Sequence, residues 1–301
     1  MSVLELLASS PAVFVGTCLV LGLIVGSFLN VVIYRLPIML ERSWREQCAQ
    51  GHGDAAAATL PAGLPGRFNL VVPRSACPAC QAPISAWQNI PLISWVLLGG
   101  RCATCREPIS LRYPLVEMLS GVLCAAVAWR FGFGWPALAA LTLTWFLIAL
   151  TFIDIDHQLL PDNLTLPLLW LGLLLSLLGP QDAAAIPVSL RSSLLGAAAG
   201  YASLWSVYHL FRLFTGKEGM GYGDFKLFAA LGAWLGVQML LPIILIAAVS
   251  GALAGIAMMV LRGRSRSSPI AFGPFLAGAG WLVLMFGQPW VSSYLLFAAQ
   301  P

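Results

Sequence analysis

The sequence predicts an all-α polytopic membrane protein of about eight transmembrane helices, with a small zinc-knuckle domain after the first of them. Of its 301 residues, 59% are hydrophobic and only 9% are charged, whereas ordinary globular chains carry about 25% charged residues. A soluble fold of this size could not cover its surface with so few charges. We therefore expect much of the protein surface to face a lipid bilayer. The net charge of +4 is small, and nucleic acid is therefore not an expected partner.

Uncharged segments give the expected spans. Residues 12–34 are long enough for a crossing of about 20 residues, and Arg35 and Pro37 are expected to end that helix. Residues 227–261 are too long for one crossing, so Pro242 near their middle predicts two helices and a tight turn. Further spans are expected at 113–129, 136–153, 164–179, 193–211 and 270–286. We therefore divide the chain into a first transmembrane helix (1–34), a cysteine domain (35–112) and a transmembrane domain (113–301). We find no internal sequence repeat.

Positive charges give the orientation. Residues 35–112 hold eight Lys and Arg, and the loops on the same side add six, which makes 14 of the 16 in the chain. Those six are Arg212, Lys217, Lys226, Arg262, Arg264 and Arg266, while Arg130 and Arg191 lie on the opposite side. Because cytoplasmic loops carry the excess of positive charge, we expect a cytoplasmic cysteine domain and two termini on the outer side.

Four cysteines form two close pairs, Cys77-Pro-Ala-Cys80 and Cys102-Ala-Thr-Cys105. Each short turn presents two sulfurs to one ion, a pattern that fits a tetrahedral Zn²⁺ site. Two disulfides or free thiols are the alternatives, and the reducing cytoplasm disfavours the disulfides. Four protein ligands would close the coordination sphere, so the expected zinc is structural.

The chain has only 12 acidic residues, and four of them lie next to expected spans. Asp154, Asp156 and Asp162 cluster after the third span, and Asp224 precedes the sixth, after Gly221-Tyr-Gly223. Asp154 and Asp224 should therefore both lie at the cytoplasmic membrane boundary. Two adjacent carboxylates can share one proton, so that one activates water while the other donates to a scissile carbonyl. Gly221 and Gly223 would allow close backbone approach and unusual torsions beside Asp224.

Other interpretations of these acids remain open. Asp162 suits a turn or a helix cap, Asp224 could be an N-cap or be neutralised by Lys226, and Asp156 could be a solvated loop residue. A different class of protein, an ion- or proton-coupled transporter, could also use intramembrane acids. A transporter would place them near the bilayer midplane on broken helices, whereas these acids stand at span ends.

In their order, these motifs resemble the type IV prepilin peptidase and N-methyltransferase family, whose members are GxGD aspartyl proteases. The resemblance covers nearly the whole chain and is carried by residues 26–37, 73–77, the second cysteine pair, 112–117, 154–162 and 221–224. It implies that Asp224 and Asp154 are catalytic, with Asp156 as the alternative first aspartate. It also implies a bacterial inner-membrane enzyme, which cleaves the basic leaders of prepilins and pseudopilins of a type IV pilus or type II secretion system. In such a membrane, the outer side that the charges predict for both termini is the periplasm.

Methyl transfer from S-adenosylmethionine to the new N-terminus is implied by the resemblance alone. No Gly-rich loop follows a strand, and residues 35–112 are too few for a doubly wound cofactor fold. The family region of the expected methyltransferase part includes Asn30, Arg35, Pro37, Pro73, Arg74, Asn89, Pro91, Ser94, Trp95, Arg112, Pro114 and Glu117.

Overall fold

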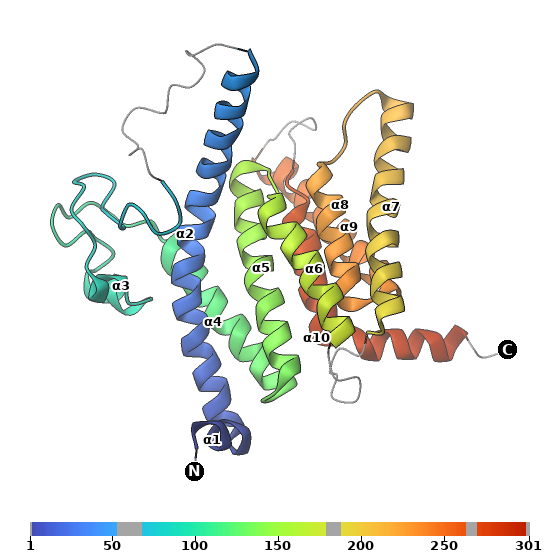
Figure 1. The fold of residues 1–301 in the computed structure, drawn as a ribbon, viewed down its shortest axis with the longest axis horizontal. Coiled ribbons are helices and arrows are strands. Elements are labelled where there is room, and N and C mark those ends of the chain that lie inside the picture. The colour runs from blue at the N-terminus through green and yellow to red at the C-terminus, as the bar shows by residue number, and fades with distance from the viewer. Residues whose placement is uncertain (1, 53–67, 179–187, 263–269, 299–301) are drawn as a thin grey trace. The chain divides into compact units, whose positions relative to one another are not determined.

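The computed structural model describes residues 2–52, 68–178, 188–262 and 270–298, most of which are helical (Figure 1). Among them, four helical segments are long and apolar enough to cross a membrane: residues 11–49, 112–131, 135–157 and 237–261. Two shorter apolar helices cover residues 162–178 and 273–287. The all-helical membrane architecture is therefore confirmed, while the number of eight crossings and the side of the termini stay predictions.

The first long helix does not end where we expected. Helix α1 (Val3–Ser9) is followed by α2 (Pro11–His52), and Pro37 lies inside α2. Arg35 also lies inside α2, and its guanidinium donates to the backbone carbonyls of Asn69 and Pro73, at 2.9 and 2.7 Å. A proline inside a helix removes one backbone hydrogen bond, and α2 continues through it.

The long apolar segment after residue 227 does contain two helices, but the break is not at the proline. Helix α8 (Tyr222–Leu235) ends at Gly236, whose φ of +84° lies in the region that favours glycine. A 3₁₀ turn (Val237–Met239) then leads into α9 (Leu240–Arg262). Pro242 lies in the first turn of α9, where a missing N–H costs no helical hydrogen bond.

The chain forms two compact units. The N-terminal unit comprises residues 15–125, and the C-terminal unit comprises residues 126–301 together with 1–14. Within the N-terminal unit, α2 packs closely on α4 (Arg112–Phe131). A Cβ added at Gly22 would stand 2.7 Å from the Ser120 carbonyl oxygen, and one at Gly26 would stand 2.8 Å from the Glu117 Cα. The two helices therefore touch backbone to backbone.

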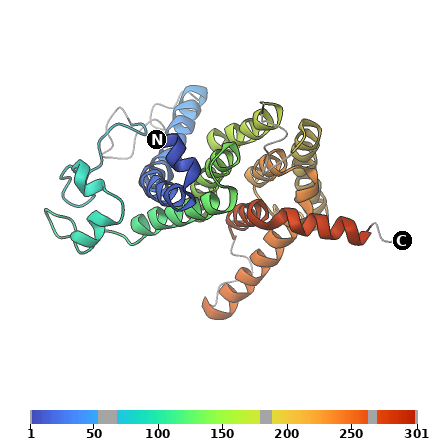
Figure 2. The same cartoon turned by 90° about the horizontal axis from the view of Figure 1, so that it is seen from below.

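The C-terminal unit is a bundle of α5 (Trp135–His157), α6 (Asp162–Leu178), α7 (Leu190–Thr215), α8, α9 and α10 (Gly273–Ala298). Figure 2 shows it from below, with α9 (orange) and the last part of α10 (red) running across the picture. Helix α8 is its core, since every residue from 227 to 235 is buried. Its Trp234 indole donates to the Leu168 carbonyl of α6 at 2.7 Å, and its Ala233 carbonyl accepts from Ser193 of α7 at 2.6 Å. These polar contacts fix α8 against both neighbours.

Small residues bring α7 against α8. Gly196 and Gly200 are spaced as in the Gly-x-x-x-Gly pattern of close helix pairs, and both are buried on α7. A Cβ at Gly200 would stand 2.8 Å from the Phe228 carbonyl oxygen. Our sequence reasoning missed this pattern, although it would have predicted the contact.

The cysteine segment contains a short internal repeat, contrary to our expectation. Residues 77–85 and 102–110 share the pattern Cys-x-x-Cys-x-x-Pro-Ile-Ser. In each copy the first cysteine N–H bonds the carbonyl five residues later, and an isolated bridge closes the turn, Ala76 with Pro83 and Arg101 with Pro108. A short 3₁₀ turn (Ala86–Asn89) and α3 (Ile93–Leu97) separate the copies.

Candidate active site and metal centre

Two aspartates from distant parts of the chain meet inside the C-terminal unit. Asp154 stands in the last turn of α5, and Asp224 stands in the first turn of α8. Their residues are only 5% and 6% exposed. The carboxylates are close enough for a direct charge–charge interaction. The structure thus brings together the two acids that the sequence singled out, at helix ends and not at mid-helix.

Asp154 is held by a backbone donor from a third helix. The N–H of Gly273, the first residue of α10, donates to Oδ2 of Asp154 at 2.9 Å. Leu160 lies beside both groups, since a Cβ at Gly273 would stand 3.2 Å from its Cδ1. Nothing in the sequence analysis pointed to Gly273.

Asp224 is held by its own helix. Gly221 is the N-cap of α8, and its N–H donates to Oδ2 of Asp224 at 3.2 Å. Asp224 is therefore not the N-cap residue itself. Its Oδ1 is buried and has no hydrogen-bond partner among the described residues. This oxygen can exchange a proton with a substrate or a water molecule that enters the site.

The two glycines before Asp224 behave differently from our expectation. Neither has an unusual torsion: Gly221 has φ −82° and ψ 152°, and Gly223 is helical. Gly223 does permit a close approach, but to the chain itself, since a Cβ there would stand 2.6 Å from the Leu160 Cβ. At Gly221 the nearest atom to an added Cβ is Asp224 Oδ2, at an ordinary 3.8 Å.

Asp156 and Asp162 stand apart from the buried pair. Asp156 is exposed, on the other side of α5 from Asp154. Asp162 is the first residue of α6, and the Lys226 ammonium donates to both of its carboxylate oxygens at 2.6 and 2.7 Å. Lys226 therefore bridges α8 to α6 and does not pair with Asp224, which was one of the open alternatives.

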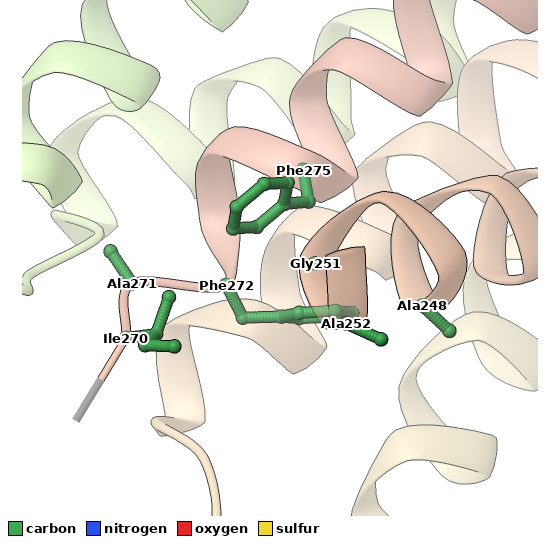
Figure 3. A pocket seen from close by; sticks show the side chains of 7 residues that line it. All are labelled: Ala248, Gly251, Ala252, Ile270, Ala271, Phe272 and Phe275. Carbon is green, nitrogen blue, oxygen red and sulfur yellow. The ribbon is translucent and has the colours of Figure 1, made fainter. Parts of the chain in front are cut away.

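An apolar pocket of about 150 Å³ adjoins the end of α10 that holds Asp154. Figure 3 shows Ala248, Gly251 and Ala252 of α9 facing the segment 270–272 and Phe275. Because Phe272 directly precedes Gly273, apolar surface lies one residue from the Asp154 donor. Among the described residues, no polar side chain lines this pocket.

The four predicted metal ligands form one cluster. The sulfurs of Cys77, Cys80, Cys102 and Cys105 all lie within 4.8 Å of one another, and none of the four is in a disulfide. The Cys77 and Cys105 sulfurs are 3.8 Å apart, which is about the spacing of two sulfurs on a tetrahedral ion at ~2.3 Å. The backbone N–H groups of Cys105 and Thr104 lower the pKa of the Cys102 thiol to about 6, so at neutral pH it favours the thiolate that metals bind.

Polar residues of the expected methyltransferase region hold backbone in place. The Asn30 amide donates to the Tyr113 carbonyl at 3.1 Å, Arg35 donates to the two carbonyls described above, and Glu117 accepts from the Leu92 N–H at 2.9 Å. Leu92 has a φ of +56°, a conformation that is costly for a branched side chain. These buried groups order the N-terminal unit.

Known proteins match the chain over most of its length. Residues 20–131 match the bacterial peptidase A24 N-terminal domain, and residues 141–256 match the type IV leader peptidase family. Curated proteins named prepilin leader peptidase/N-methyltransferase are 54% identical in Stutzerimonas stutzeri and 51% identical in Pseudomonas aeruginosa, each over 99% of both chains. One from Neisseria gonorrhoeae is 51% identical over 88% of this chain and 87% of its own. No solved structure matches the chain.

Proposed function

The chain belongs to the type IV leader peptidase family, and on that premise we propose that Asp154 and Asp224 are the catalytic pair that cleaves the leader from prepilins. Gly221 and Gly223 support Asp224 in this proposal. The observation that carries it is the meeting of two buried carboxylates at the ends of α5 and α8. The exposure of Asp156 supports Asp154 as the first aspartate in its place.

The proposed chemistry uses one shared proton. One carboxylate takes a proton from water, the water oxygen adds to the scissile carbonyl carbon, and the protonated partner gives its proton to the carbonyl oxygen. The carbon–nitrogen bond then breaks. The first carboxyl returns its proton to the leaving amine, and the second recovers one from the new carboxyl group. The net change is the addition of one water molecule to one peptide bond.

The proposed substrates are prepilins and pseudopilins in a bacterial inner membrane. Their basic leaders would stay on the cytoplasmic side, where 14 of the 16 Lys and Arg of this chain are expected. Both termini would then be periplasmic. A scissile bond at the start of a hydrophobic helix would reach Asp154 and Asp224 at helix ends, without the midplane position that a transporter site requires.

The names of the full-length relatives include N-methyltransferase, which indicates a second activity. We place methyl transfer from S-adenosylmethionine to the new N-terminal amine in the N-terminal unit, which the A24 N-terminal domain matches. Cys77, Cys80, Cys102 and Cys105 would hold a structural Zn²⁺ there, because their donor set and spacing fit a closed tetrahedral site.

The experiment that tests the proposal follows a purified prepilin by intact mass in detergent. Wild type, Asp154→Asn and Asp224→Asn are compared, with Asp156→Asn as the matched control on the same helix as Asp154. We expect a leader-sized loss of mass with wild type and with Asp156→Asn only. Addition of S-adenosylmethionine to wild type should add one methyl group to the product. Cleavage by Asp154→Asn or Asp224→Asn would remove that residue from the catalytic pair.

A further inference from the structure

The first turn of α10 has a single N–H without a partner inside its own helix. The Phe272 carbonyl accepts from the N–H groups of Phe275 and Leu276, each at 3.1 Å. Pro274 has no N–H to offer. The remaining donor, Gly273, is directed at Oδ2 of Asp154. The carboxylate therefore caps α10 from 119 residues away, as the side chain of an N-cap residue ordinarily would.

Glycine is required for this contact. A Cβ added at Gly273 would stand 2.6 Å from Oδ2 and 3.1 Å from Cγ of Asp154, and 3.2 Å from Cδ1 of Leu160. Contacts under 3.0 Å are essentially never seen for real Cβ atoms. Any other residue at position 273 would therefore displace the carboxylate of Asp154.

The two carboxylates are held unequally. Each acid meets the N-terminus of one helix, Asp154 that of α10 and Asp224 that of α8, so the dipoles of these two helices favour both anions. The hydrogen bonds differ: Asp154 accepts one of 2.9 Å from Gly273. Asp224 accepts a longer hydrogen bond of 3.2 Å from Gly221 and keeps Oδ1 buried without a donor or acceptor in the described part of the chain. Because two adjacent carboxylates share one proton, the proton belongs on the carboxyl whose charge is less well compensated.

We propose that Gly273 is a positioning residue that holds Asp154 ionised as the general base and thereby makes Asp224 the proton donor. This inference rests on the proposed peptidase function. Asp154 then takes the proton of the attacking water, and Asp224 gives its proton from Oδ1 to the scissile carbonyl oxygen. When the carbon–nitrogen bond breaks, Asp154 protonates the leaving amine and Asp224 regains a proton from the new carboxyl group.

The test measures kcat, KM and pH dependence of prepilin cleavage by Gly273→Ala. Its matched controls are Gly278→Ala, where an added Cβ meets nothing within 4 Å, and Gly280→Ala, where it meets Leu231 at 2.5 Å. All three variants add the same methyl group to α10. We expect Gly273→Ala to lose about 10- to 100-fold in kcat, as for a hydrogen bond to a charged group, with KM nearly unchanged. The acid limb of its pH–rate profile should move toward neutral pH, because the anion loses its donor.

A second variant guards against misfolding of Gly273→Ala. Pro274→Ala adds an N–H to the same helix end without filling the space beside Asp154, so the acid limb should move to lower pH. A common response of Gly273→Ala and Gly280→Ala, or a limb that stays in place in both Gly273→Ala and Pro274→Ala, would overturn the inference. If Asp154→Asn and Asp224→Asn also cleave, the peptidase site itself is wrong. If they are inactive while Gly273→Ala cleaves normally, only the role of Gly273 is wrong.

Discussion

Gly223→Ala is the substitution whose effect the structure predicts most directly, with Gly221→Ala as its control. The added methyl at position 223 would stand 2.6 Å from the Leu160 Cβ, whereas ordinary contact begins at 3.4 Å. The start of α8 must therefore move relative to Leu160 by roughly 0.8 Å, the difference between those two distances. A misplacement of about 1 Å can cost ~100-fold in rate, and Asp224 is the next residue in the chain. We expect Gly223→Ala to lower kcat by about 10- to 100-fold.

Gly221→Ala adds the same methyl two residues away, at an ordinary 3.8 Å from the nearest atom. Its φ of −82° suits alanine, although glycine is the better N-cap by a few tenths of a kcal/mol or more. We expect near-normal kcat. The assay is the rate of leader release by intact mass, normalised to inserted, monodisperse protein. Equal kcat in the two variants would refute the reasoning, since the close approach of Gly223 to Leu160 would then be irrelevant to the site.

Three further sets of substitutions test whether residues outside the buried aspartate pair contribute to hydrolysis. Asp156→Asn should alter kcat by no more than about twofold, because substitution of an exposed side chain away from the site changes a free energy by no more than ~0.5 kcal/mol. A loss of activity as large as that of Asp154→Asn would make Asp156 the first catalytic aspartate. Lys226→Met should lower the free energy of unfolding by at most ~1 kcal/mol, which is what a partly exposed ion pair contributes. It should leave the pH–rate profile in place, because Lys226 pairs with Asp162. A shifted profile would make Lys226 the counterion of Asp224. The double substitution Cys77→Ser and Cys102→Ser should lose one bound zinc per chain, as measured by elemental analysis. It should reduce methylation of a precleaved pilin more than it reduces leader cleavage. Unchanged metal content would disprove the four-sulfur site.

The sequence predicts those parts of the site that local pattern determines. Asp154 and Asp224 stand out because acids are rare in this chain and both adjoin apolar segments. The four cysteines stand out by spacing, and the structure gathers their sulfurs as expected. In each case the signal lies within a few residues of the chemistry, so no knowledge of tertiary packing is needed.

Tertiary contacts account for what the sequence analysis missed. The sequence predicts a helix end at Arg35, but Arg35 lies inside α2 and the carbonyls that accept its hydrogen bonds are more than 30 residues away. The sequence places Lys226 two residues after Asp224, but its ion-pair partner is Asp162, 64 residues earlier. Gly273 carries no local signal at all, since its contact with Asp154 depends on how α10 packs against α5. The Gly-x-x-x-Gly pattern of α7 and the repeat of residues 77–85 in 102–110 were both visible in the sequence and overlooked.

The hydrogen-bond and ion-pair partners around the two acids determine whether the pair can keep a shared proton inside a membrane protein. A lysine beside the pair would stabilise both carboxylates as anions, and no shared proton would remain for the carbonyl oxygen. The nearby Lys226 is instead committed to Asp162, and the two acids receive one backbone N–H each, from Gly273 and Gly221. Backbone dipoles compensate negative charge only in part, which leaves one carboxyl to carry the proton. The pairing of Lys226 with Asp162 thus keeps a free ammonium from neutralising the proposed catalytic pair.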